Sequence, residues 1–197
     1  MIKYLLLLIT LFMATNLYSQ TGNSPLPYHQ IPDYPDKYSA TTTVARMLDG
    51  LGYRYYWATD SLRTEDLEYK PSEDSRSAGH TIEHIHGLSQ TVLNAIQQKA
   101  NVPTEPEELS FEETRKRTLE NFKIASEILK NSKKKDLKKF DIVFKRGDKS
   151  SSFPFWNLLN GPIADAIYHT GQIVAYRRAS GNPLNSKVSV FTGKNKE

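Results

Sequence analysis

Apolar residues return every three or four positions in two stretches of the first half of the chain, a spacing that predicts amphipathic helices. The first stretch predicts a helix over about residues 40–62. Its apolar positions are Val44, Met47, Leu48, Leu51, Tyr55 and Trp57 or Ala58. The second follows a cap at Ser75 or Ser77 and ends near residue 100. Its apolar positions are Ala78, Ile82, Ile85, Leu88, Val92, Leu93 and Ile96.

A third helix is predicted to begin at Ser110, because Ser110-Phe-Glu-Glu113 reads as a capping box. Its inward positions are Leu119, Phe122, Ala125, Ile128 and Leu129. Residues 140–146 instead alternate as a short strand or extended arm does, and Gly147 ends that pattern.

The fourth helix is predicted over residues 162–180. Pro162 after Gly161 opens or kinks a helix, and Gly181 before Asn182-Pro183 is a termination signal. One broad side of this helix is apolar. A polar ridge runs beside it, formed by Asp165, His169, Gln172 and Tyr176 at spacings of four, three and four.

Four helices with long middle connections and no sustained heptad predict a bundle, a fold that places metal sites on facing helices. With 38% hydrophobic residues among 197, the chain can form one domain with a real core. We therefore predict an all-α fold, a four-helix bundle with a short extended arm before the last helix. The bundle spans residues 38–183, between an extended lead-in (20–37) and a C-terminal tail (184–197).

Residues 1–19 carry the pattern of a secretory signal peptide: Lys3, an apolar run over residues 4–14, and small and polar residues up to Ser19. The apolar run is too short to span a bilayer comfortably. We therefore expect an exported protein, periplasmic or secreted, with no membrane span.

The chain has no cysteine, so His, Asp and Glu must supply any metal ligands. The net charge is +4, and much of the excess lies between residues 133 and 149, where seven lysines and Arg146 outnumber three aspartates. Nucleic-acid binding favours aromatic residues interleaved on a defined platform. We therefore interpret this segment as a solvated surface and expect no nucleic-acid partner.

One histidine of the second helix faces the interior in a helical projection. His84 lies nearest the edge of the apolar side, whereas His80 and His86 project further outward in opposite directions. His84 and the pair Asp165–His169 could converge on one ion, because neighbouring helix axes stand about 8–10 Å apart. Two imidazoles and a carboxylate with open positions are typical of a catalytic metal site. A polar network without metal is the alternative reading of the same residues.

Three segments together resemble the DinB-like (YfiT-type) proteins. These are residues 52–62 with their Tyr-Arg-Tyr-Tyr-Trp-Ala-Thr run, residues 77–85 (Ser-Ala-Gly-His-Thr-Ile-Glu-His-Ile), and His169-Thr-Gly-Gln172-Ile, whose helix ends at Gly-Asn-Pro183. The resemblance covers about residues 38–183 and implies a metal-dependent enzyme on a four-helix bundle, and a homodimer. It places metal ligands on His84 and His169, and a third on Asp165, where the family usually has His. Some members are thiol-dependent transferases that use cytoplasmic thiols.

The first functional hypothesis is an exported DinB-like metalloprotein, a hydrolase of a small-molecule substrate. In it His84, Asp165 and His169 hold a divalent ion (zinc, nickel or iron) that activates water. Glu83 and Gln172 are the catalytic candidates beside the ion. The alternatives are a thiol-dependent transferase or a non-catalytic bundle that binds a ligand, for instance in a pocket lined by Tyr55, Tyr56 and Trp57.

Overall fold

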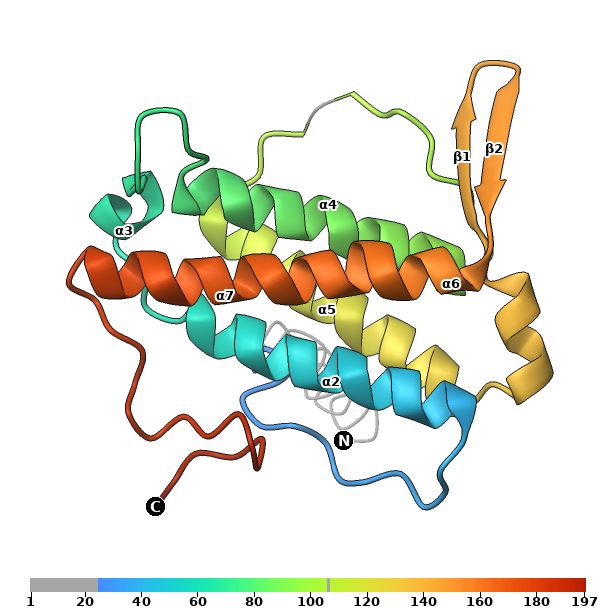
Figure 1. The fold of residues 1–197 in the computed structure, drawn as a ribbon, viewed down its shortest axis with the longest axis horizontal. Coiled ribbons are helices and arrows are strands. Elements are labelled where there is room, and N and C mark those ends of the chain that lie inside the picture. Colours follow the sequence, from blue (N-terminus) through green and yellow to red (C-terminus); the bar gives the residue numbers. More distant parts are fainter. Residues whose placement is uncertain (1–24, 106) are drawn as a thin grey trace, which may run out of the picture.

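The computed structural model describes residues 25–105 and 107–197, and four long helices dominate it (Figure 1). They are α2 (Ala40–Ala58), α4 (Ala78–Ile96), α5 (Phe111–Lys130) and α7 (Ala164–Ala179). α2 and α7 run in one direction along the bundle, and α4 and α5 run in the other. The prediction of an all-α four-helix bundle is confirmed. The predicted signal peptide, residues 1–19, lies outside the described residues.

The helices begin at caps that the sequence predicts. Ser77 accepts a hydrogen bond from the backbone N–H of His80 at 3.2 Å, and Ser110 accepts one from that of Glu113 at 3.1 Å. The Glu113 side chain does not return to Ser110 as a full capping box requires; it accepts from Arg117 Nε at 2.7 Å. Helix initiation is thus set locally, and Glu113 supports the next turn of its own helix.

The helix ends differ from the predicted ones. α2 ends at Ala58 rather than near residue 62, because Ser61 has a positive φ of 54° that a right-handed helix excludes. A short helix that the sequence did not predict, α3 (Thr64–Glu68), follows. α4 ends at Ile96, ahead of Gln98 at φ 57°.

The predicted extended arm is the first strand of a hairpin. β1 (Ile142–Arg146) pairs antiparallel with β2 (Lys149–Phe153), so that Ile142 lies opposite Phe153 and Arg146 opposite Lys149. A 3-10 segment, η1 (Lys134–Lys139), precedes it. The hairpin is tied to the bundle through Asn101, whose backbone N–H donates to Val143 at 2.7 Å and whose C=O accepts from Lys145 at 2.9 Å.

A wide helical turn connects the hairpin to the last helix. α6 (Phe155–Leu158) runs into the π turn η2 (Leu159–Ile163) and then into α7. Gly161 has non-helical angles of φ −96° and ψ −106°, and Pro162 follows it without an N–H to donate. Pro162 therefore lies at a kink inside a longer helical segment, one of the two outcomes that the sequence predicts.

The segments before and after the bundle pack together along α2. Ile31 is buried with Tyr53 and Trp57, and its N–H donates to the carbonyl of Gly193 at 2.8 Å. At Gly52 a Cβ would overlap the ring of Tyr28, so only glycine allows this approach. Parts of the lead-in and of the tail therefore belong to the packed structure.

Within the described ranges, no helix is long and apolar enough to cross a membrane.

A buried carboxylate joins α3 to the end of α7. Asp66 accepts from the backbone N–H of Arg63 at 2.8 Å, from its guanidinium at 2.8 Å, from Ser180 Oγ at 2.6 Å and from Asn182 Nδ2 at 2.7 Å. These donors, the Arg63 side chain first, hold the pKa of Asp66 far below its usual range. The ionised form of Asp66 therefore stabilises the junction.

Replacing Asp66 by Asn should lower the free energy of unfolding by about 3 kcal/mol at neutral pH, because a buried charged acceptor with several donors is lost. The folded-state pKa is depressed, so this contribution is present above the unfolded-state value of about 4 and is lost as the pH falls below it. Urea unfolding should show the parent and Asp66→Asn converging in acid. Glu65→Gln, an exposed partner of Arg63, is the matched control and should change little; a gap between parent and Asp66→Asn that persists in acid would contradict the assignment.

Candidate metal centre

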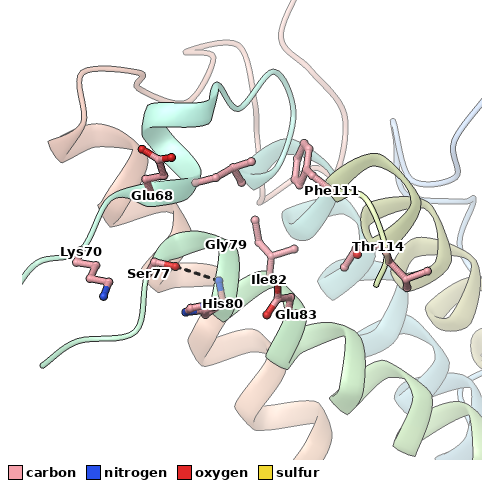
Figure 2. A pocket seen from close by; sticks show the side chains of 11 residues that line it. Glu68, Lys70, Ser77, Gly79, His80, Ile82, Glu83, Phe111 and Thr114 are labelled. Atoms are coloured by element: carbon pink, nitrogen blue, oxygen red, sulfur yellow. Dashed lines mark hydrogen bonds between the residues drawn. The ribbon is translucent and has the colours of Figure 1, made fainter. Parts of the chain in front are cut away.

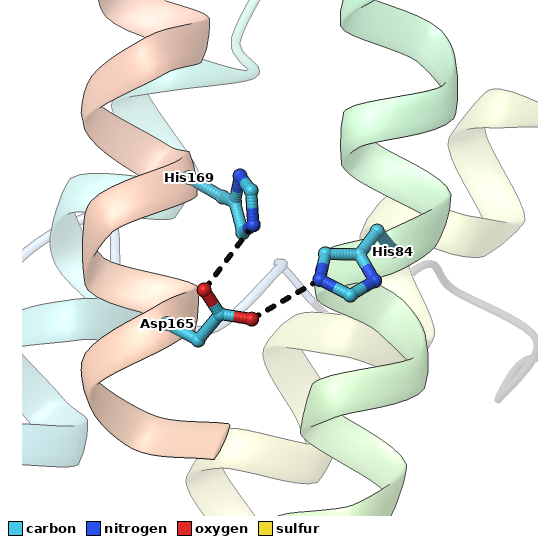
Figure 3. Close-up of side chains that lie close together, drawn as sticks. All are labelled: His84, Asp165 and His169. Carbon is cyan, nitrogen blue, oxygen red and sulfur yellow. Dashed lines mark hydrogen bonds and ion pairs between the residues drawn. The ribbon is translucent and has the colours of Figure 1, made fainter. Parts of the chain in front are cut away.

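Three side chains with metal-binding groups converge between α4 and α7. His84 projects from α4, and Asp165 and His169 project from successive turns of α7 toward it (Figure 3). Each residue offers one ligand atom, and these atoms all lie within 4.8 Å of one another. The structure thus brings together the three residues that the sequence analysis selected.

Asp165 lies between the two imidazoles and contacts both. Its Oδ2 is 3.1 Å from Nε2 of His84, and its Oδ1 is 3.3 Å from Nε2 of His169. The two rings meet nearly at right angles, with centroids 4.7 Å apart. Both Nε2 atoms therefore face the same carboxylate from different helices.

The helix faces explain this convergence. On α7, Ala166, Thr170 and Ile173 are buried, which leaves the Asp165–His169 ridge at the edge of the core. On α4, Ile85 is fully buried and His84 precedes it at the border toward α7. The polar groups therefore meet between two helices whose apolar sides face the core.

The second nitrogen of His169 has its own partner. Nδ1 lies 2.6 Å from Oε1 of Gln172, and Nε2 of Gln172 donates to the hydroxyl of Tyr168 at 3.2 Å. When Nδ1 donates to Gln172, neutral His169 presents the Nε2 lone pair toward Asp165. Metal-binding histidines commonly have such a partner on the nitrogen away from the metal.

The centre is open to solvent on one side. The side chains of His84 and Asp165 are 34% and 40% exposed, whereas that of His169 is 14% exposed. Two nitrogen donors and one carboxylate oxygen suit zinc, nickel or iron, and the open side leaves room for water or substrate. The donor set and its geometry fit a divalent metal ion.

The sequence model of the DinB family matches residues 51–186, more than half of the chain. The chain belongs to the DinB family. The matched range contains α4, α5 and α7 and all three residues of the candidate centre. No curated protein and no solved structure matches the chain.

One histidine lies elsewhere than predicted in this DinB protein. His86 was expected to point outward, but it is buried between α4 and α5, with Nδ1 3.1 Å from Oγ1 of Thr118. That hydroxyl donates to the carbonyl of Thr114 at 2.7 Å, so it accepts from His86. Burial lowers the pKa of His86. The projection fails here because α4 is covered on two sides, by α5 and by α7.

Glu83 lies apart from the three metal-binding candidates. It lines a cavity of about 520 Å³ between α3, α4 and the start of α5 (Figure 2). Leu67, Ile82 and Phe111 supply apolar walls, and the exposed His80 stands at the same cavity. The catalytic role of Glu83 stays a prediction. Its side chain lines this cavity and is not among the three clustered metal-binding candidates.

The aromatic residues of α2 lie in packed clusters, so the alternative of a ligand pocket lined by Tyr55, Tyr56 and Trp57 finds no support among the described residues. Tyr55 is fully buried against Phe122, with ring centroids 6.4 Å apart, in the main core. Trp57 belongs to a separate cluster with Ile31 and Tyr53. Tyr55 and Trp57 therefore belong to two separate hydrophobic clusters.

Replacing Gln172 by Leu should weaken binding of a divalent metal by about tenfold or more, because His169 loses the acceptor that holds its Nδ1–H. Gln172→Glu keeps an acceptor and should retain the affinity. Competition with a chelating dye gives the affinity, and ¹⁵N spectra of the histidine side chains report the tautomer without metal. Gln90→Leu, at an exposed position of α4, is the control; equal affinity and an unchanged tautomer in Gln172→Leu would show that the contact has no orienting role.

Proposed function

We propose that this DinB protein is a metal-dependent hydrolase in which His84, Asp165 and His169 hold one divalent ion: zinc, nickel or iron. The observation that carries the proposal is the carboxylate of Asp165 lying between the Nε2 atoms of two imidazoles from facing helices. When bound, such an ion supplies a Lewis acid that polarises a substrate oxygen and activates water.

The hydrogen-bonding capacity of His169 supports a cation at this point. Both of its ring nitrogens face oxygen acceptors, Oε1 of Gln172 at 2.6 Å and Oδ1 of Asp165 at 3.3 Å. A neutral imidazole has one N–H, so when that hydrogen lies on Nδ1, either a further proton on Nε2 or a metal ion would complete the contact with Asp165. Nε2 of His84 contacts the same carboxylate. A metal ion shared by His84, Asp165 and His169 would therefore use all three side chains as ligands.

The exposure of the centre supports a small-molecule substrate. His84 and Asp165 are each more than a third exposed, so a ligand can reach them from solvent without any helix moving. Tyr168 and Gln172 lie beside His169 and offer a hydroxyl and an amide. In this proposal Gln172 orients His169, and the residues around the opening select the substrate.

Export is part of the proposal and rests on the sequence pattern of residues 1–19. An exported protein would rarely meet the low-molecular-weight thiols of the cytoplasm. Hydrolysis is therefore favoured over thiol transfer.

A homodimer is the further part of the proposal, and the outer side of α7 supports it. Ala164, Tyr168, Gly171 and Ala175 are exposed there and fall within about 60° of one another around the helix. This stripe carries no charge and allows close approach of a second helix. The opening of the centre lies next to it, on the side of Gln172.

Ala175→Arg should convert the dimer to a monomer, because it places a charge in the uncharged stripe that the two copies would share. Size-exclusion chromatography with light scattering measures the mass directly. Gln90→Arg adds the same charge on an exposed position of α4 and should leave the mass unchanged. A parent protein that is monomeric at every concentration would remove the dimer from the proposal.

Protein purified without a His tag should contain close to one divalent ion per chain, and His84→Ala or Asp165→Ala should lose most of it. Asp165→His should retain metal, since it supplies a third imidazole in the same direction. Elemental analysis gives the metal content, and melting in the presence and absence of added Zn²⁺ or Ni²⁺ gives the linked stabilisation.

His80→Ala is the matched control, because His80 is exposed one turn before His84 and contacts neither Asp165 nor His169. It should leave the metal content unchanged. Equal metal in the parent, His84→Ala and Asp165→Ala would overturn the site. A parent that binds no metal and melts unchanged with added ion would support the alternative of a non-catalytic bundle.

A further inference from the structure

Aromatic side chains are exposed on the hairpin and just after it. A loop that is only solvated would be expected to carry polar residues there. Phe144 on β1 is 39% exposed and Phe153 at the end of β2 is 43% exposed. Trp156, in α6 just beyond the hairpin, is 75% exposed. Figure 1 shows the hairpin projecting from one end of the bundle, with α6 at its base. Two exposed aromatic residues therefore lie on the hairpin, and a third follows three residues after its last strand residue.

The strand register places the aromatic rings on the same face as two cations. Side chains alternate along a strand, so Phe144, Arg146, Lys149, Ser151 and Phe153 share one face of the hairpin. The rings of Phe144 and Phe153 pack edge to face, with centroids 6.3 Å apart. Arg146 and Lys149 lie opposite each other at the far end. We call these five residues the hairpin face.

The cations of the hairpin face lack acidic partners. Across residues 25–105 and 107–197, no carboxylate lies within ion-pair distance of Arg146 or Lys149. Asp148 in the turn is the one acidic residue between Ile142 and Phe153. Like charges directly opposite in a hairpin are destabilising. An anionic group placed between Arg146 and Lys149 would relieve that repulsion.

The hairpin is held firmly enough to act as a docking element. An isolated two-stranded hairpin is only marginally stable in water. Here Phe140 and Ile142 are buried in the core, and Asn101 bonds to the free edge of β1 from both its N–H and its C=O. The base is thus fixed, and only the far half and the serine-rich β2 face solvent.

We propose that the hairpin face, together with Trp156, docks the protein on an anionic lipid surface. Arg146 and Lys149 would contact lipid phosphates, and Phe144, Phe153 and Trp156 would enter the interface between headgroups and acyl chains. Aromatic residues and adjacent cations are the pattern that favours this interface. The charge of the face complements an anionic leaflet.

A lipid surface fits the shape better than a nucleic acid does. Phe144 and Phe153 pack against each other instead of presenting a row of parallel rings for bases. The hairpin also projects from the bundle, and Phe144, Arg146 and Lys149 line a hollow of about 430 Å³ on it. A projecting element with apolar side chains next to cations can enter a bilayer surface.

The test is binding of the full chain to vesicles of phosphatidylcholine alone and of an equimolar mixture with phosphatidylglycerol, measured by co-sedimentation. We expect binding only to the anionic vesicles, with a blue shift in tryptophan emission. Trp57 is buried, so the shift reports Trp156. Arg146→Gln combined with Lys149→Gln should reduce partition about thirtyfold, and Phe144→Thr about tenfold.

The matched control is Lys134→Gln combined with Lys138→Gln, which removes the same charge from exposed positions of η1. It should leave partition unchanged, and melting curves of all variants confirm that each is folded. An equal loss in both double variants would mean that net charge alone drives binding, and would overturn the proposal. So would absence of binding to anionic vesicles, or binding to a single-stranded oligonucleotide that depends on the cations but not on Phe144.

Discussion

The position of α7 along the bundle depends on one buried guanidinium. Arg177, in the last turn of α7, donates to the carbonyls of Trp57 at 2.8 Å and Ala58 at 3.1 Å, at the end of α2. It also donates to the carbonyl of Asn182 at 2.8 Å. Carbonyls at a helix end have no partner within their own helix, so Arg177 satisfies two of them and fixes α7 against α2. A slip of one turn would move Asp165 by about 5.4 Å, which exceeds the spread of the candidate metal ligands.

The other end of α7 is set by the π turn. Buried positions before and after it are Phe155, Leu158, Ile163, Ala166, Thr170, Ile173 and Arg177. The step from Leu158 to Ile163 is five residues, whereas all the others are three or four. A π turn accommodates one extra residue, so both parts keep their apolar side toward the core. Without it, either α6 would leave the core or the Asp165–His169 ridge would rotate away from α4.

Features that depend on neighbouring residues could be predicted from the sequence, and features set by distant partners could not. Ser77 and Ser110 cap their helices because the bonded N–H lies three residues further on. β2 was missed because Lys-Ser-Ser-Ser-Phe has no apolar alternation, and its pairing with β1 alone makes it a strand. His86 was misplaced because a helical projection assumes one buried side, while α4 packs against both α5 and α7.

The residues of the candidate site could be predicted from the sequence for a related reason. Asp165 and His169 are one turn apart on a helix, so their common direction is a local property. Their meeting with His84 is not local, and it followed from the bundle and from the family resemblance. The contact of Gln172 with His169 could be anticipated from their spacing of three, whereas the bond from Gln172 to Tyr168 needed the side-chain conformations.

Asp165 gives this centre a charge that a third histidine would not. Two neutral imidazoles and a carboxylate leave a bound dication with a net charge of +1 instead of +2. A buried carboxylate would be costly whenever the site is vacant, but the side chain of Asp165 is 40% exposed and touches two imidazoles. Water and the histidines can therefore stabilise it without a metal. An oxygen donor also moves the site toward harder ions than three imidazoles would prefer. The partial exposure that opens the centre to solvent is thus the same property that lets a carboxylate occupy position 165.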